Sequence, residues 1–182
     1  MNNKKHLIKI TTAAVMIALT CVLTMVVRIP SPTKGYMNLG DCAVLLSGWL
    51  LGPVWGSLAG GIGSALADLF SGYPVYMPGT FIIKALMGLI VSLVPLFFRE
   101  SKKGIRRVAF VTASLIAEAL MIAGYWLYEA VVIGYGFIPA LAGVSGNIVQ
   151  GIVGIAGSCF LVEILSRTDI MRIYNINDNE KR

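Results

Sequence analysis

Long apolar stretches, separated by short polar or Gly/Pro-rich breaks, alternate along nearly the whole chain. Their lengths predict six membrane-spanning α-helices, because about 20 apolar residues cross a bilayer as a helix. We place these helices at residues 7–27, 39–51, 54–70, 80–98, 108–132 and 141–165. The second is short for a straight span, and Gly52-Pro53 provides a tight turn into the third. A polar tail covers residues 166–182. The pattern therefore predicts an all-α integral membrane protein with a single domain over residues 1–182.

The composition agrees with a membrane protein and argues against an enzyme. The 182 residues are 57% hydrophobic and only 13% charged, with a mean hydropathy of +0.79, whereas a soluble domain carries roughly a quarter charged residues. Cys21, Cys42 and Cys159 are too widely spaced for a metal or disulfide pattern. The single histidine, His6, lies in the basic N-terminal segment, and no GxxxxGK[ST] phosphate loop occurs. We therefore expect no catalytic residue, no metal, no cofactor and no ATP hydrolysis by this chain.

Basic residues are distributed unevenly between the two ends of the predicted bundle. With six spans, the N-terminus, the turn at residues 52–53, the loop at 99–107 and the C-terminal tail share one side, which carries twelve Lys and Arg residues. The opposite side carries only Arg28 and Lys34. Because cytoplasmic loops are enriched in Lys and Arg, both termini are expected in the cytoplasm. The three loops rich in Tyr, Gly and Pro then face outside, where an external solute arrives.

Charged side chains within the predicted spans are candidate functional residues. Each costs about 2.5–3.5 kcal/mol to insert unless it finds a partner or water. Asp41 begins the second helix and could cap its free amides. Asp68 and Lys84 flank one short loop, so we expect a structural ion pair between them, with direct contact to a substrate as the alternative. Glu118 lies in the middle of the fifth helix, where a bare carboxylate is hardest to explain structurally.

Aromatic and amide side chains gather toward the outer ends of the fifth and sixth helices. Tyr125 and Trp126 lie close to Glu129. They could form an aromatic belt at the membrane interface, or a box that stacks on a flat heterocycle while the carboxylate accepts its polar hydrogens. Asn147 and Gln150 lie about one turn apart beside glycines. They could bond across helices or pair with the edge of such a ring.

Small residues form two stripes on the predicted helices. Gly or Ser recurs at every fourth position from residue 52 to residue 64, so one helix face allows another backbone to approach closely. That face could pack helices together or admit a substrate. Ala14 and Ala18 form a small-xxx-small pair on the first helix, which could pack internally or dock on a separate membrane subunit.

Several of these segments together resemble the S-components of energy-coupling factor (ECF) vitamin transporters, in the group with riboflavin-, pyridoxine- and hydroxymethylpyrimidine-type members. The resemblance rests on YMNLGD at residues 36–41, GGIGSALAD at 60–68, GYPVYMPGT at 72–80 and IK at 83–84. It covers nearly the whole chain and points to the group rather than to one vitamin. The first helix also resembles the family's alanine motif, with Ala14 and Ala18 in place.

The resemblance implies a division of labour in a bacterial cell membrane. An S-component binds its vitamin at the outer face, under the loop after the first helix and the loops before the fourth and sixth. A module of one transmembrane coupling subunit, onto which the alanine motif docks, and two ATPases then makes it topple in the bilayer and release the vitamin inside. The positions that match the family's pocket are Asn38, Tyr76, Lys84, Tyr125, Trp126, Glu129, Asn147 and Gln150.

The solute and two rival functions stay open at this point. Aromatic residues with a few polar groups favour a hydroxymethylpyrimidine- or pyridoxine-like solute, with riboflavin or cobalamin as alternatives. One rival is a stand-alone small-solute transporter or channel, which would transport without partners. The other is a membrane enzyme acting on lipids, with Glu118 or Glu129 as its base.

Overall fold

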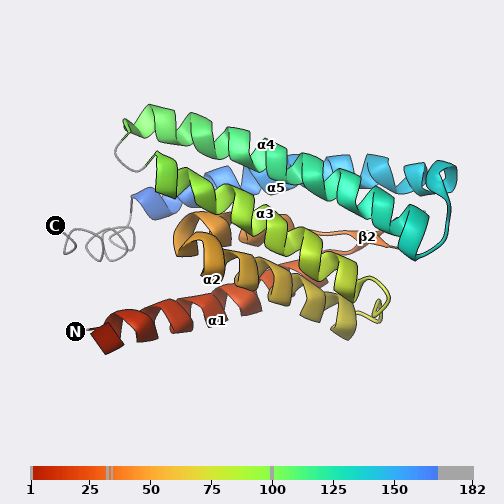
Figure 1. The fold of residues 1–182 in the computed structure, drawn as a ribbon, viewed down its shortest axis with the longest axis horizontal. Coiled ribbons are helices and arrows are strands. Elements are labelled where there is room, and N and C mark those ends of the chain that lie inside the picture. The colour runs from red at the N-terminus through yellow and green to blue at the C-terminus, as the bar shows by residue number, and fades with distance from the viewer. Residues whose placement is uncertain (1, 32, 34, 99–100, 168–182) are drawn as a thin grey trace.

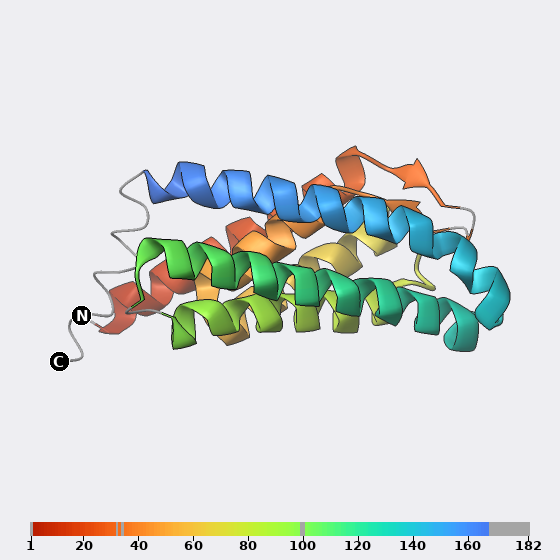
Figure 2. The same ribbon diagram turned by 90° about the horizontal axis from the view of Figure 1, so that it is seen from above.

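The computed structural model describes residues 2–31, 33, 35–98 and 101–167, and shows a bundle of helices that share one long axis (Figure 1). In chain order the elements are α1 (Asn2–Val26), β1 (Ile29–Pro30), β2 (Tyr36–Met37), α2 (Gly40–Phe70), α3 (Met77–Phe97), α4 (Lys103–Leu127), the π-helical turn η1 (Tyr128–Val132) and α5 (Phe137–Ser166). The start of α1 and the end of α5 lie at the same end of the bundle (Figures 1 and 2). Most of the tail expected at residues 166–182 lies outside the described residues.

The described residues form five long helices where the sequence predicted six, because the expected helices 39–51 and 54–70 are two arms of α2. The backbone of Gly52 leaves the helical region with φ +78°, a conformation that glycine adopts without steric cost. The arms then fold back on each other. A Cβ added to Gly56 would lie 2.7 Å from the Cα of Gly48, and one added to Gly60 would lie 2.9 Å from Val44 Cγ1. The glycine stripe of residues 52–64 therefore serves close helix packing.

The other helices begin earlier than predicted, α1 at Asn2 rather than at 7 and α3 at Met77 rather than at 80. The basic segment expected as a loop at residues 99–107 enters α4 at Lys103, and α5 begins at Phe137 rather than at 141. Long basic side chains reach water from a helix end, so their charge does not end a helix. Pro139 fits the first turn of α5, where its missing N–H costs no hydrogen bond.

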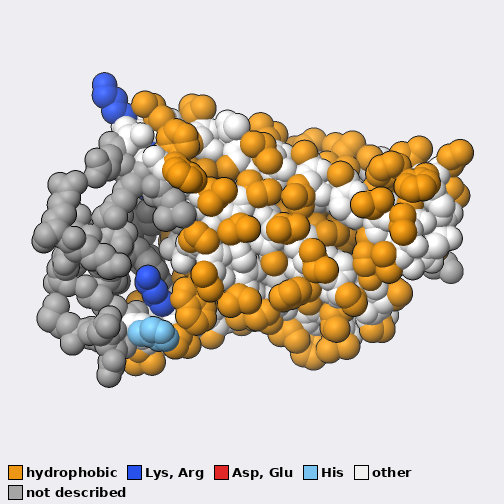
Figure 3. All heavy atoms as spheres, viewed as in Figure 1, with side chains coloured by type: hydrophobic (Ala, Val, Ile, Leu, Met, Phe, Trp, Pro, Cys, Tyr) orange, Lys and Arg blue, Asp and Glu red, His pale blue; other side chains and the backbone are white. Residues whose placement is uncertain are grey.

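The bent α2 lies at the centre of the bundle and separates two apolar clusters. Val44, Leu45, Met87 and Met121 belong to a cluster formed by α2, α3 and α4. A second cluster, which includes Ala13, packs α1 against α2. The outer surface is covered with hydrophobic side chains along its length, while the Lys and Arg side chains visible in Figure 3 lie near the end that holds the termini. Within the described part of the chain, five helices are long and apolar enough to cross a membrane, so this is a multi-pass membrane protein.

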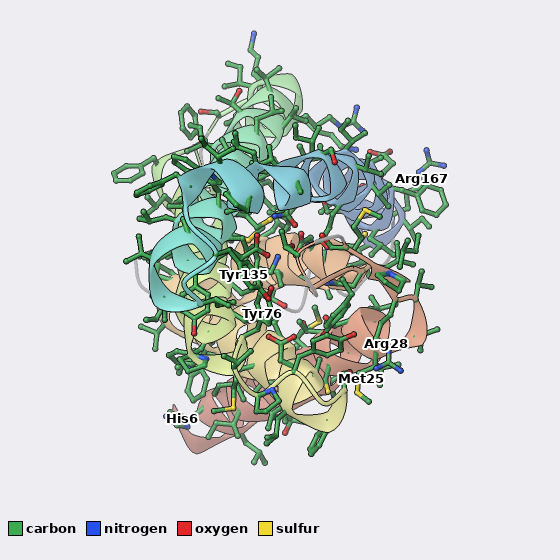
Figure 4. The ribbon with its side chains drawn as sticks, turned by 90° about the vertical axis from the view of Figure 1, so that its right-hand side faces the viewer. His6, Met25, Arg28, Tyr76, Tyr135 and Arg167 are labelled. Atoms are coloured by element: carbon green, nitrogen blue, oxygen red, sulfur yellow. The ribbon has the colours of Figure 1, made fainter. Side chains whose placement is uncertain are left out.

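The loops at the opposite end close the bundle. A short antiparallel hairpin pairs Ile29 with Met37, and the α2–α3 and η1–α5 connections lie at the same end (Figure 1). Figure 4 views the molecule from this end, where Tyr76 lies near the middle of the bundle. The hairpin loop and these connections therefore form one cap.

Candidate binding site

A small cavity lies beneath this cap, between the hairpin loop and the ends of α2–α5. The space inside amounts to about 400 Å³, solvent at its mouth included, but the centres of water-sized molecules fit only in about 30 Å³. That is room for one or two waters, so the cavity is closed in this conformation. The lining residues are Ser31, Gly35, Tyr36, Asn38, Asp68, Tyr76, Thr80, Tyr125, Glu129, Asn147 and Gln150.

Glu129 joins the roof of the cavity to the helices. It lies in the π-helical turn η1 and is 3% exposed. The Thr33 hydroxyl of the hairpin loop donates to Glu129 Oε1 at 2.8 Å, and the Tyr76 hydroxyl donates to the Thr33 carbonyl at 2.7 Å. Glu129 Oε2 is buried without a hydrogen-bond partner among the described residues. The same carboxylate thus holds the loop with one oxygen and leaves the other free.

A second carboxylate at the cavity also has one oxygen in a hydrogen bond and one oxygen without a partner among the described residues. Asp68, near the end of α2, accepts a 2.7 Å hydrogen bond from the Tyr36 hydroxyl, while its Oδ2 has no partner within the described part of the chain. Burial raises the pKa of Tyr36 well above its usual range, and the neighbouring charge of Asp68 raises it further. Tyr36 therefore keeps its proton and remains a donor. Its ring also packs against Tyr73, with centroids 4.8 Å apart.

A buried polar network forms the floor. Lys84 of α3 pairs with Asp41 Oδ1 of α2. Gln150 of α5 donates to Asp41 Oδ2 at 2.7 Å and accepts from the backbone N–H of Asn38 at 2.9 Å. Both members of the ion pair are almost fully buried, and such pairs are stable only when further hydrogen bonds satisfy them. The network connects three helices to Asn38, which directly follows the second strand of the hairpin.

This arrangement corrects two predictions. The expected Asp68–Lys84 ion pair is wrong, because Lys84 pairs with Asp41 and Asp68 bonds Tyr36 instead. Asp41 also does not cap α2. The N–H of Gly40 is bonded by Asn38 Oδ1 at 2.8 Å, and the Asp41 side chain points to Lys84 and Gln150. The first arm of α2 packs against both α3 and α5, since Gly48 contacts α3 and Gly154 of α5 contacts Asp41. Asp41 therefore reaches Lys84 although the two residues are far apart in the sequence.

The other predicted binding residues divide into two groups. Six of them line the cavity: Asn38, Tyr76, Tyr125, Glu129, Asn147 and Gln150. Lys84 lies in the floor network and is outside the lining, with its Nζ 5.4 Å from the centroid of the Tyr125 ring. Trp126 is also outside, since its Nε1 donates to the Phe137 carbonyl and its ring packs on Phe137. An aromatic box that includes Trp126 is therefore not formed.

Sequence reasoning missed four lining residues and misread a fifth. Ser31, Gly35, Tyr36 and Thr80 were not proposed as binding residues, and Asp68 was assigned to an ion pair. Tyr36 and Thr80 belong to the very segments that carry the family resemblance, so those segments contained a usable signal. Nothing in the local sequence marks Ser31 or Gly35 beyond their position in a loop of the cap.

Two further predicted features lie outside the lining of the cavity. Ala14 and Ala18 are exposed on α1, whereas Ala13 is buried against α2, so the alanine pair is open to a partner. Glu118 of α4 is 3% exposed, and both its carboxylate oxygens lack partners among the described residues. A Cβ at Gly154 would lie 2.8 Å from Glu118 Oε1, so glycine on α5 makes room for this side chain.

The fold and the cavity define a multi-pass helical membrane protein with a closed, polar pocket at one end. Comparison with known proteins specifies the class further. The family model of ECF-type riboflavin transporter S components matches residues 4–167, and the chain belongs to this family. These proteins are transporter components rather than enzymes, and membership implies association with an ECF module and a vitamin substrate.

Individual relatives agree with this assignment. The chain is 28% identical over 171 residues to the thiamine precursor transporter HmpT of Lactococcus lactis subsp. cremoris, covering 93% of this chain and 94% of the relative. It is 38% identical over 135 residues to an uncharacterized protein of Pyrococcus woesei, covering 74% of this chain and 85% of that protein. The solved S component of a bacterial ECF transporter superposes with a TM-score of 0.69 at 23% identity, covering 91% of this chain and 97% of that one, which supports the fold.

Proposed function

We propose that this protein captures a small water-soluble vitamin or precursor, of the hydroxymethylpyrimidine or pyridoxine type, and delivers it through an ECF module. The observation that carries this proposal is the pair of carboxylate oxygens, Asp68 Oδ2 and Glu129 Oε2, that are buried at the cavity without partners among the described residues. Buried acceptors require donors. A ligand with at least two N–H or O–H groups on a flat ring supplies them.

The remaining lining fits such a ring. Tyr125 and Tyr76 provide aromatic surface, and offset or edge contacts between rings stabilise a bound heterocycle. Asn147 and Gln150 reach the cavity from α5, and amide groups can pair with ring nitrogens and hydroxyls. An aminopyrimidine with a hydroxymethyl group, or a pyridine with several hydroxyls, presents this combination. The name of the Lactococcus relative points to the same class.

The orientation and the transport cycle complete the proposal. The basic end with both termini faces the cytoplasm, because the Lys and Arg residues of the loops concentrate there. The cavity then opens to the outside of a bacterial plasma membrane. Ala14 and Ala18 on the open face of α1 dock on the transmembrane coupling subunit. Two partner ATPases use ATP to drive toppling and release, so the chain itself needs no cofactor.

Binding by the purified chain tests this proposal. Isothermal titration with hydroxymethylpyrimidine, pyridoxine, riboflavin and cobalamin should show tight binding of one of the first two. Asp68→Asn and Glu129→Gln should each weaken it about tenfold to a hundredfold, since a lost hydrogen bond to a charged group costs about 1.5–3 kcal/mol. Glu163→Gln, a carboxylate at the opposite end, is the matched control. No binding of any of the four compounds would contradict the proposal.

Reconstitution separates the proposal from a stand-alone transporter. Proteoliposomes that contain only this chain should accumulate negligible ligand, while those with the coupling subunit, the two ATPases and ATP should accumulate it. Equal uptake in both would identify an independent transporter.

A further inference from the structure

A second and larger cavity lies at the opposite end of the molecule, where α4 begins and α5 ends. Water-sized molecules have about 560 Å³ available in it, within the range of ligand-binding pockets, roughly 300–1,000 Å³. Its walls come from α2, the first two turns of α4 and the last turns of α5. The vitamin cavity under the cap shares none of these lining residues.

One part of this cavity is apolar and the other is basic. Trp49 and Phe110 form the inner part and pack edge to face, with ring centroids 5.0 Å apart. Lys103, Arg106 and Arg107 of α4 form the basic part. Among the described residues of the lining, Glu163 is the single acidic one. A ligand that fills the site must therefore combine an apolar portion with negative charge.

The acidic residue does not neutralise the basic part. Glu163 pairs with Arg107, and Arg167 also donates to it at 3.3 Å. Arg106 lies over the Trp49 ring at 5.4 Å, and its Nε is buried without a hydrogen-bond partner among the described residues. A buried donor of this kind favours an acceptor with several oxygens, and guanidinium groups match phosphate geometry well.

The position of the cavity identifies the source of such a ligand. Exposed hydrophobic side chains lie beside it on α4 and α5, among them Val108 and Phe160, and Val111 of its own lining is 37% exposed. The cavity thus lies where the apolar surface of the bundle meets its basic end. In a membrane, that is the level of the phospholipid headgroups, and anionic lipids concentrate in the cytoplasmic leaflet. This position at the cytoplasmic surface rests on the membrane orientation proposed above, but it does not depend on which vitamin the protein binds.

We propose that this cavity binds an anionic glycerophospholipid, such as phosphatidylglycerol, with its phosphate at Arg106 and Lys103 and an acyl chain against Trp49 and Phe110. The lipid would occupy the space between α4 and α5 at the cytoplasmic surface. It would thereby hold together two helices whose other ends carry the vitamin pocket.

Native mass spectrometry of the full chain, delipidated in detergent and titrated with defined lipids, tests this proposal. Phosphatidylglycerol should be retained in preference to phosphatidylcholine of the same chain length. Arg106→Gln should reduce that preference about fivefold, the effect of about 1 kcal/mol per basic residue at an anionic membrane surface. Lys9→Gln, which removes a charge from α1 outside the cavity, is the matched control and should leave the preference unchanged.

Two further arms make the result decisive. Glu163→Gln should increase phosphatidylglycerol retention, because it removes the acidic residue from the lining. Inorganic phosphate at millimolar concentration should fail to displace the lipid, since it lacks the acyl chain. If Arg106→Gln does not fold, Lys103→Gln takes its place, because Lys103 is exposed. Equal retention of the two lipids, or equal effects of the cavity and control variants, would overturn the proposal, as would displacement by phosphate alone.

Discussion

The buried pair of Lys84 and Asp41 gives the sharpest test of the structure. Lys84→Met keeps the length of the side chain and removes its charge. Asp41 is fully buried, and it would retain only the 2.7 Å hydrogen bond from Gln150. Removing one partner of a buried ion pair costs about 3–5 kcal/mol, because the other charge is left uncompensated. For a chain of this size each kcal/mol lowers the melting temperature by about 2–4 °C, so a fall of about 6–20 °C is expected.

Thermal unfolding in detergent, followed by circular dichroism, measures this effect, and a double-mutant cycle assigns it. The single variants Lys84→Met and Asp41→Asn should each destabilise strongly. The double variant should recover much of the loss, because no unpaired charge then remains. Asp68→Asn is the matched control, since Asp68 bonds Tyr36 and not Lys84.

Two results would refute this reasoning. If Asp68→Asn coupled to Lys84→Met more strongly than Asp41→Asn did, the ion pair expected from the sequence would be the real one. If both single variants melted within about 2 °C of the parent, the pair would contribute too little to hold the floor of the cavity.

The remaining predictions concern other parts of the bundle. Gly143→Ala should weaken vitamin binding about tenfold, because the added Cβ would lie 2.8 Å from the Glu129 carboxylate and crowding of this kind costs about 1–3 kcal/mol. Calorimetry measures the affinity, and Gly104→Ala is the control because Gly104 has open space around it. Ala14→Leu should abolish co-purification with the coupling subunit and leave vitamin affinity intact, whereas Ala119→Leu on the exposed face of α4 should alter neither. Glu118→Gln should leave vitamin binding unchanged and keep or raise the melting temperature, because an amide of nearly the same shape replaces a buried carboxyl group that has no partner among the described residues; a fall of more than about 5 °C would show that the carboxyl group is needed.

Much of the fold could be predicted because the bilayer sets the length of an apolar helix. The Gly52-Pro53 break was located correctly from sequence, since glycine permits the positive φ that the turn requires. The sequence could not show that the turn is so tight that both arms belong to one bent element, α2. It also could not place the start of α4 at Lys103, because charge alone does not distinguish a loop from a solvated helix end.

The site was harder to predict, because its contacts join segments far apart in the chain. Lys84 was expected to pair with Asp68, which precedes it by a short loop, yet its partner Asp41 comes from the first arm of α2. Such a pairing depends on how far the packed helices are shifted and rotated relative to each other, and this cannot be predicted from a single sequence. Trp126 illustrates the same limit. It follows Tyr125 directly on α4, but Tyr125 lines the cavity whereas Trp126 lies on another face of the helix and bonds Phe137.

The closed cap has a consequence for affinity. Hydrogen bonds from Tyr36 and Thr33 to the two carboxylates, and from Tyr76 to the Thr33 carbonyl, hold the hairpin loop over the cavity. At about 1.5–3 kcal/mol for each of the two bonds to a carboxylate and about 1 kcal/mol for the third, they total about 4–7 kcal/mol, which leaves the open state at about one molecule in a thousand to one in a hundred thousand. Opening limits how often a ligand enters, but it costs no affinity when the same bonds re-form over the bound ligand. The ligand gains affinity at the two carboxylate oxygens that the cap leaves unpaired, because those bonds form without breaking any that hold the loop. The same residues can then close the cap over the ligand and select for its donors.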